Sequence, residues 1–232
     1  MWDNERQETI VGAVDGAVTT LVALFEREPT RFFTENDLVC CFHRMLHEAL
    51  AGVGLATAPD KDGKPHNLIH CEYPTPFRCD MGDKRFEIKS DDARTPGGKK
   101  YRRGRFDVAV LNPSFIGKHS NATVKAQHYD AFRSAALSEP SVDAPVAFYG
   151  VEFVFCRDEI KPSRGGDWEK AAKEFVAKVQ QDTAKLRAGV AVTGFMTRGV
   201  MLAFVKGTTG KVMEAIHRSL IALPCVRLTT AP

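Results

Sequence analysis

Two acidic residues stand inside short apolar stretches of this sequence. Asp107 lies in residues 105–113 and Glu152 in residues 149–155, and both stretches are otherwise typical of buried β-strands. Burying a carboxylate in such a strand costs several kcal/mol unless a partner compensates its charge. If the two strands lie side by side, the acids share one positive partner, and the commonest is a divalent metal ion. The sequence therefore predicts a metal site at Asp107 and Glu152.

A run of cations leads directly into the strand that carries Asp107. It follows residues 90–98, whose aspartate, proline and glycine content is typical of a loop. Five side chains carry the positive charge: Lys99, Lys100, Arg102, Arg103 and Arg105. Tyr101 lies between them in the sequence. Clustered cations suit contacts to a nucleic-acid backbone. A charge run is also often only a solvated surface, and both interpretations stay open here.

The hydrophobic pattern predicts the elements that position these residues. An amphipathic helix covers residues 5–28 and stops at Pro29. A second helix follows Thr34, which can cap it, and Glu35 lies in its first turn. Further strands are expected at 67–75 (ended by proline), 85–89, 190–195, 199–205 and 226–230, and further helices at 124–137, 167–189 (capped by Asp167) and 211–223. This order predicts an α/β fold, with a central mixed sheet flanked by helices.

Composition bounds the class of protein. The 232 residues fit one domain, with an N-terminal helix in 1–30, a core in 34–205 and a C-terminal helix and strand in 206–232. The net charge of +3 permits a nucleic-acid partner without requiring one. Six cysteines without a Cys-x-x-Cys pair predict reduced thiols and a cytoplasmic location. No apolar run approaches the ~18 residues of a membrane span, and the N-terminus has no signal-peptide pattern, so no membrane partner is expected.

The usual sequence signals of small-molecule enzymes are absent from the chain. It contains no Gly-x-Gly-x-x-Gly run, no phosphate-binding loop and no Gly-x-Ser-x-Gly motif. A small-molecule enzyme on an unrelated α/β scaffold therefore remains only a third hypothesis beside the two that follow.

The order of acids and elements resembles the PD-(D/E)XK nuclease superfamily, which has the restriction-endonuclease-like fold. The matching segments are residues 34–38, 70–75, 104–110, 150–155 and 182–186, which together span most of the chain. The resemblance implies that Asp107 and Glu152 hold one or two Mg²⁺ (or Mn²⁺) ions and that the chain hydrolyses DNA, with RNA less favoured. Some members add a carboxylate from the first core helix to the metal site. Glu35 could have this role, in addition to its simpler role as an acid in the first turn of its helix. Cutting both strands of a duplex commonly takes two active sites, so a homodimer is natural under this hypothesis.

The chain departs from the family at one catalytic position. The family has a lysine two residues after the acid of the second strand. In this chain that acid is Glu152 and the position holds Val154, which can neither hold nor activate a water. Lys185 on the long helix is the first candidate to replace it, Lys161 is the second, and Lys89 on a neighbouring hairpin is a third. If no lysine replaces it, the chain is a nuclease-fold module without catalysis that binds nucleic acid or a protein partner.

A literal Glu-x-Lys occurs elsewhere, at Glu87 and Lys89. Its upstream acid would be Asp80 or Asp83, seven or four residues earlier. That spacing leaves little room for a second strand and a turn. The segment is also short and flanked by polar residues, unlike a central buried strand.

Overall fold

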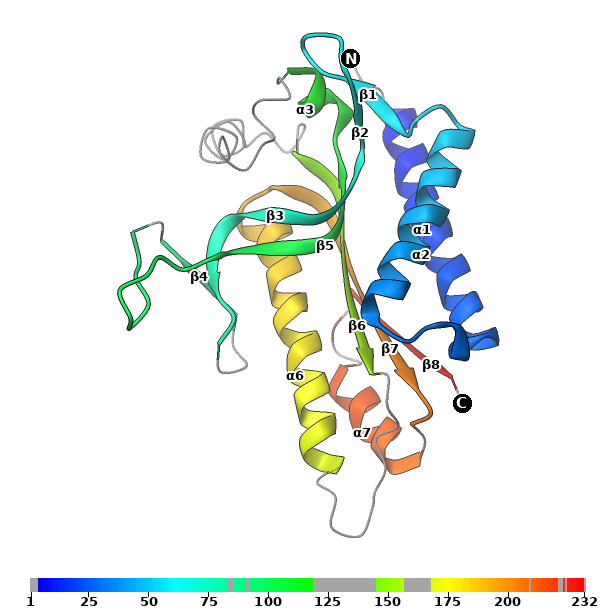
Figure 1. Ribbon diagram of the computed structural model, residues 1–232, viewed down its shortest axis with the longest axis vertical. Helices are drawn as coiled ribbons and strands as arrows, with labels where there is room; N and C mark the ends of the chain where they lie inside the picture. The colour runs from blue at the N-terminus through cyan, green and yellow to red at the C-terminus, as the bar shows by residue number, and fades with distance from the viewer. Residues whose placement is uncertain are drawn as a thin grey trace.

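The computed structural model describes residues 4–82, 86–90, 92–118, 145–156, 168–208, 210–220, 223 and 225–231. Its centre is a six-stranded sheet in the order β4-β3-β5-β6-β7-β8. The helices α1 and α2 lie on one side of this sheet, and α6 and α7 lie on the other (Figure 1). The predicted fold class, an α/β protein with a mixed central sheet flanked by helices, is confirmed.

The elements follow one another in an order that explains the mixed sheet. They are α1 (Asn4–Arg27), a 3₁₀ turn (Pro29–Arg31), α2 (Glu35–Gly52), β1 (Thr57–Pro59), β2 (Pro65–Asn67), β3 (Ile69–Asp80), β4 (Glu87–Lys89), β5 (Arg103–Leu111), α3 (Pro113–Lys118), β6 (Ala147–Cys156), α6 (Trp168–Arg187), a π-helical turn (Ala188–Val192), β7 (Met196–Lys206), α7 (Gly210–Leu220) and β8 (Val226–Ala231). Strands β4, β3, β5 and β6 are antiparallel neighbours, whereas β6, β7 and β8 are parallel. The parallel strands need crossover connections, and α6 and α7 provide them.

The first turn of α2 is fixed by the predicted cap. The Thr34 hydroxyl accepts a hydrogen bond from the backbone N–H of Asp37 at 3.2 Å, and the Asp37 carboxylate accepts one from the backbone N–H of Thr34 at 2.8 Å. This reciprocal arrangement is a capping box. On the buried face of the helix, Phe42 meets Phe153 of β6 edge-on, with ring centroids 5.6 Å apart. Cap and core contact together hold Glu35 beside the end of β6.

Helix α1 corrects one expectation. Its segment Glu5–Arg27 is long and apolar enough to cross a membrane by length and composition, whereas no such segment was expected. The helix carries Ile10, Val14 and Leu21, whose side chains are fully buried against the rest of the protein, as in a core helix. The cytoplasmic location stays a prediction.

Two strands differ from those predicted. Strand β3 does not end at Pro74 but runs on to Asp80, with an irregular register against β5 between Pro74 and Arg78. Proline has no N–H to donate to the ladder, and irregular stretches of this kind tolerate it. Residues 190–195 are not a strand, because the π-helical turn extends α6 to Val192, and β7 then begins at Met196. The predicted helix at 124–137 and the Asp167 cap lie outside the described residues.

The sheet forks between its two central strands. Strand β5 pairs with β6 only from Val108, opposite Val151, to Leu111, opposite Ala147. The earlier residues of β5 stay with β3 instead, and the two strands together turn away from β6 (Figure 1). Asp107 and Glu152 are the first residues beyond the last pair. The fork therefore opens at the two acids.

Candidate active site

Asp107 and Glu152 stand next to each other where β5 and β6 separate. The Asp107 carboxylate accepts a hydrogen bond from the backbone N–H of Phe153 at 2.7 Å, which replaces the ladder partner that β5 no longer supplies. Glu152 is only 1% exposed, although it is an acid on a central strand. The structure thus brings together the two acids that the sequence singled out, although they are far apart in the chain.

Lys185 of α6 reaches this pair of acids. Its ammonium lies 2.8 Å from Glu152 Oε1 and 3.1 Å from Asp182 Oδ1, and it donates to the Arg105 carbonyl at 2.8 Å. The residue is 6% exposed. A lysine this deeply buried needs such partners, because an uncompensated charge would cost several kcal/mol.

The other two lysine candidates are not brought to the acids. Lys89 lies on β4, at the outer edge of the sheet, where its ammonium is 2.7 Å from the carboxylate of Glu87. Strand β3 separates β4 from the strand that carries Asp107. Lys161 lies outside the described residues. Within the described chain, Lys185 is the lysine that meets the acids.

Two glycines allow α6 to come close enough for this contact. A Cβ atom on Gly150 would lie 3.3 Å from Leu186 Cδ2 of α6, and one on Gly199 would lie 3.1 Å from the same atom. Both glycines are on the strands that α6 covers, and Leu186 follows Lys185 directly. Larger residues at these positions would push the helix outward and move the ammonium of Lys185 away from Glu152.

Glu35 adds a third carboxylate at the edge of the fork. Its Oε2 accepts a hydrogen bond from the backbone N–H of Phe155 at 3.2 Å and one from the Lys178 ammonium at 2.8 Å. Its negative charge is close enough to contribute to the raised pKa of Asp107. Glu35 therefore lies near Asp107 as well as in the first turn of α2, and its further role in the site stays a prediction.

Burial dominates the electrostatics of the acids. It raises the pKa of Asp107 to about 6, and the nearby charge of Glu35 adds to this effect, whereas the Phe153 N–H and the Lys185 ammonium oppose it. Burial also raises the pKa of Glu152 well above the ordinary value, against the attraction of Lys185. For Lys185, burial alone lowers the pKa, but the charges of Glu152 and Asp182 outweigh it and raise the pKa. Lys185 is therefore a permanent cation at neutral pH.

The donor set of the fork suits a hard cation. Glu152 Oε1 is buried and, although Lys185 stands beside it, receives no well-directed hydrogen bond. Carboxylate oxygens are the ligands that Mg²⁺ and Mn²⁺ prefer, and Mg²⁺ keeps several waters, so few protein ligands are needed. Among the described residues, no group of three or more His, Cys, Asp or Glu side chains is arranged to hold a metal ion. Asp107 and Glu152 are the two neighbouring carboxylates of the fork that could hold such an ion.

The competing Glu-x-Lys segment also forms a strand pair. Asp80 of β3 lies directly opposite Glu87 of β4, so the expectation that the spacing leaves too little room was wrong. The short connection between the two strands is enough for an antiparallel pair. The Glu87 side chain is 67% exposed, however, and a solvated carboxylate does not need a cation to compensate burial. Asp83 lies outside the described residues.

The predicted basic run occupies the start of β5 and the loop before it. Lys99, Lys100, Arg102 and Arg105 are exposed and Arg103 is half-buried. The Arg105 guanidinium lies 3.3 Å from the carboxylate of Glu72, a residue with φ of +53°. Arg103 donates to the Pro76 carbonyl at 3.5 Å. These cations lie on the branch of the fork that carries Asp107.

Sequence reasoning missed the part played by two helical residues. Asp182 is 6% exposed and holds Lys185 from one helical turn away, and Lys178 pairs with Glu35 across the opening of the fork. The signal for Asp182 was its spacing of three residues from Lys185, which places both on one face of a helix. No local pattern marks Lys178, because its partner lies on another helix.

No protein-family model matches this chain, and neither a curated protein nor a solved structure matches it. The functional assignment therefore depends on the geometry of the fork.

Proposed function

We propose that this protein is a metal-dependent nuclease of the PD-(D/E)XK kind, which hydrolyses DNA phosphodiester bonds at the fork between β5 and β6. One observation carries the proposal. A buried lysine from α6 lies 2.8 Å from a buried glutamate on a central strand, beside an aspartate on the neighbouring strand. This supplies the cation that Val154 fails to provide. The oxygen donors and the fixed positive charge needed for phosphoryl chemistry then meet at one place.

Each residue has a distinct task in this proposal. Asp107 and Glu152 would hold the divalent ion, and a bound ion would lower the pKa of an attacking water and neutralise charge on the phosphate. Lys185 stays protonated, since Glu152 and Asp182 raise its pKa, and so acts as a fixed cation for the attacking water and the phosphate oxygens rather than as a base. Glu35 supplies a further carboxylate at the edge of the site. The water oxygen bonds to phosphorus as the bond from phosphorus to the deoxyribose oxygen breaks; the attacking water gives up a proton to solvent, and the leaving oxygen takes one from solvent.

The test is cleavage of plasmid and single-stranded DNA with Mg²⁺ or Mn²⁺. Wild-type protein is expected to cut, and Asp107→Ala and Lys185→Met are each expected to lower the rate at least ~100-fold. Lys173→Met is the matched control, because Lys173 lies on the same helix with its side chain 75% exposed. Wild-type protein that cuts no DNA with either metal, in a sample shown to be folded, would refute the proposal.

A second candidate function is a nuclease-fold module without catalysis. It is favoured by the ion pair between Lys185 and Glu152 and by the lack of a group of three metal-binding side chains among the described residues. Under this hypothesis the Lys185 ammonium permanently occupies the position of the metal beside Glu152. Calorimetry separates the two: no heat of Mn²⁺ binding, together with salt-sensitive DNA binding, supports the module.

A further inference from the structure

The branch of the fork that carries Asp107 extends into a projecting arm. The arm consists of the outer half of β3 (residues 74–80), β4, residues 92–102 and the start of β5 (residues 103–105). In Figure 1 it reaches out sideways from the body of the protein, away from α1 and α2. Its outer end is a small hairpin, in which Thr95 N–H donates to the Lys99 carbonyl at 2.8 Å and Gly98 N–H to the Thr95 carbonyl at 2.8 Å.

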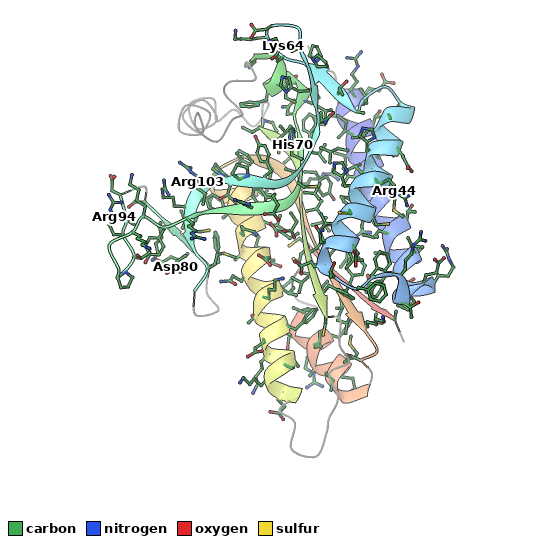
Figure 2. All side chains as sticks on the ribbon, in the orientation of Figure 1. Arg44, Lys64, His70, Asp80, Arg94 and Arg103 are labelled. Atoms are coloured by element: carbon green, nitrogen blue, oxygen red, sulfur yellow. The ribbon has the colours of Figure 1, made fainter. Side chains whose placement is uncertain are left out.

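Four cations of the arm lack a partner. Arg94, Lys99, Lys100 and Arg102, which we call the tip cations, are all exposed, and none forms an ion pair with a described residue. Elsewhere on the arm, Lys89 pairs with Glu87 of β4, and Arg105 pairs with Glu72 of the inner half of β3. The unpaired positive charge is thus concentrated at the outer end, where Figure 2 shows Arg94.

Two tip cations face each other across the hairpin. Arg94 and Lys100 form an isolated antiparallel bridge, which places their side chains on the same face of the hairpin. Like charges directly opposite each other destabilise a strand pair. An isolated protein gains nothing from this arrangement, whereas a polyanion bound at the tip would turn the repulsion into a pair of favourable contacts. The two facing cations of the tip therefore favour a polyanionic partner.

The distance from the fork to the tip selects the kind of polyanion. Lys100 precedes Asp107 by seven residues, so an extended chain at about 3.3 Å per residue separates them by at most about 23 Å. A duplex presents phosphates at a fixed spacing over such a distance, at about 3.4 Å per base pair. A flexible single strand must be ordered before it can reach both points at once. Simultaneous contact at fork and tip thus favours a duplex, with at most about seven base pairs between the two points.

The hairpin shape of the tip favours one form of the duplex. A two-stranded β-ribbon fits the major groove of B-form DNA, which is about 12 Å wide. The major groove of A-form RNA is deep and too narrow for side chains to read. A hairpin with a cation on either side of its turn can contact the phosphates that line the two sides of the DNA groove.

We propose that the arm places its tip in the major groove of double-stranded B-form DNA, within about seven base pairs of the phosphate at the fork. The proposal rests on the proposed nuclease function for the position of the scissile phosphate, but duplex binding by the tip does not depend on cleavage. The arm then determines that the substrate is duplex DNA rather than a single strand or RNA.

Binding without catalysis tests the arm. Fluorescence anisotropy in EDTA, with a DNA duplex, an RNA duplex and a DNA single strand of equal length as probes, compares wild-type protein with Arg94→Ala/Lys100→Ala. The arm variant is expected to bind duplex DNA at least ~10-fold more weakly, and the slope of log K against log salt is expected to become shallower by about 0.9 per lost phosphate contact. RNA-duplex and single-strand binding should change much less.

A matched control removes the same amount of charge elsewhere. Arg44→Ala/Lys64→Ala takes two exposed cations from α2 and the β1–β2 turn, which Figure 2 shows away from the arm. This variant should bind duplex DNA as wild-type protein does. Equal loss in both double variants, unchanged duplex binding in the arm variant, or an equal loss for all three probes would each overturn the proposal.

The outcomes separate this proposal from the nuclease function. If wild-type protein cuts nothing but the arm variant loses duplex binding selectively, the nuclease proposal fails and the arm proposal stands. If the protein cuts DNA and the arm variant binds and cuts duplex as wild-type protein does, the arm proposal fails alone. Circular dichroism and thermal unfolding show that both variants are folded. The melting temperature of the arm variant should not fall, because the substitution removes a like-charge pair.

Discussion

Replacing Asp107 by asparagine is expected to stabilise the protein while abolishing cleavage. The substitution removes a charge that burial disfavours and keeps an oxygen that can accept from the Phe153 N–H. Burial raises the pKa of Asp107 from its ordinary 3.8 to about 6. At about 1.4 kcal/mol per pKa unit, the ionised carboxylate destabilises the folded state by about 3 kcal/mol. Asp107→Asn should therefore raise the free energy of unfolding by up to about 3 kcal/mol at neutral pH.

This gain depends on pH in a defined direction. Below pH 3.8 the carboxyl of Asp107 holds its proton in both the folded and the unfolded protein, so wild type and variant differ little. Between pH 3.8 and about 6 the unfolded state releases the proton first, and wild-type stability falls as the pH rises. Above about pH 6 the difference is complete and constant. The advantage of asparagine should therefore appear within this window.

Urea unfolding monitored by circular dichroism measures the effect. The experiment is run in EDTA at pH values from about 4 to about 8, where the linear extrapolation gives the free energy of unfolding of each protein. Adding Mg²⁺ should then stabilise the wild type more than the variant, because only the wild type keeps the carboxylate ligand. A variant that is less stable than the wild type above pH 6 would refute the reasoning, since the carboxylate would then be a structural group.

Three further substitutions test the supports of the fork. Lys185→Met leaves the carboxylate of Glu152 buried without a cation and should lower the free energy of unfolding by about 3–5 kcal/mol in urea, while Lys185→Met/Glu152→Gln should recover most of the loss. Thr34→Ala removes the cap of α2 and should cost about 1 kcal/mol in the same measurement. Gly199→Ala places a methyl group 3.1 Å from Leu186 Cδ2 and, by displacing α6, should cost about 1–3 kcal/mol and slow DNA cleavage.

Each of these substitutions has a matched control in the same chain. Lys173→Met removes an exposed lysine of α6, and Thr19→Ala removes an exposed threonine of α1; both should change stability by less than about 0.5 kcal/mol. Gly12→Ala adds a methyl group in the middle of α1 with nothing within 4 Å and should gain about 0.5–1 kcal/mol. Losses in the controls as large as those at the fork would contradict the roles assigned to Lys185, Thr34 and Gly199.

The sequence predicted those parts of the fold that local pattern determines. The helix after Thr34 begins where its cap and first-turn acids place it, because capping depends on a few adjacent residues. An acid inside an apolar strand is equally local, so Asp107 and Glu152 could be singled out before their neighbours were known. That Asp107 and Glu152 are neighbours was a hypothesis about strand order. The register of β5 against β6 agrees with this hypothesis.

Other features of the fold depend on tertiary contacts and could not be predicted from the local sequence pattern. Residues 190–195 are apolar enough for a strand, yet residues 190–192 continue α6 as the end of a π-helical turn. The Met196 side chain packs against this turn, where a Cβ atom on Gly189 would lie 2.8 Å from Met196 Cε. The length of β3 beyond Pro74 depends on its partners β4 and β5, since proline alone predicts an end. The pairing of Lys178 with Glu35 joins two helices that only the folded sheet brings together.

The fork leaves two backbone amides as built-in reporters. The N–H groups of Phe153 and Phe155 are each held by a side-chain carboxylate, from Asp107 and Glu35, rather than by a neighbouring strand. Any ligand that draws these carboxylates toward itself therefore weakens two backbone amide hydrogen bonds of β6. Amide-proton chemical shifts and hydrogen-exchange rates at two positions would then register occupancy in solution, without a turnover assay.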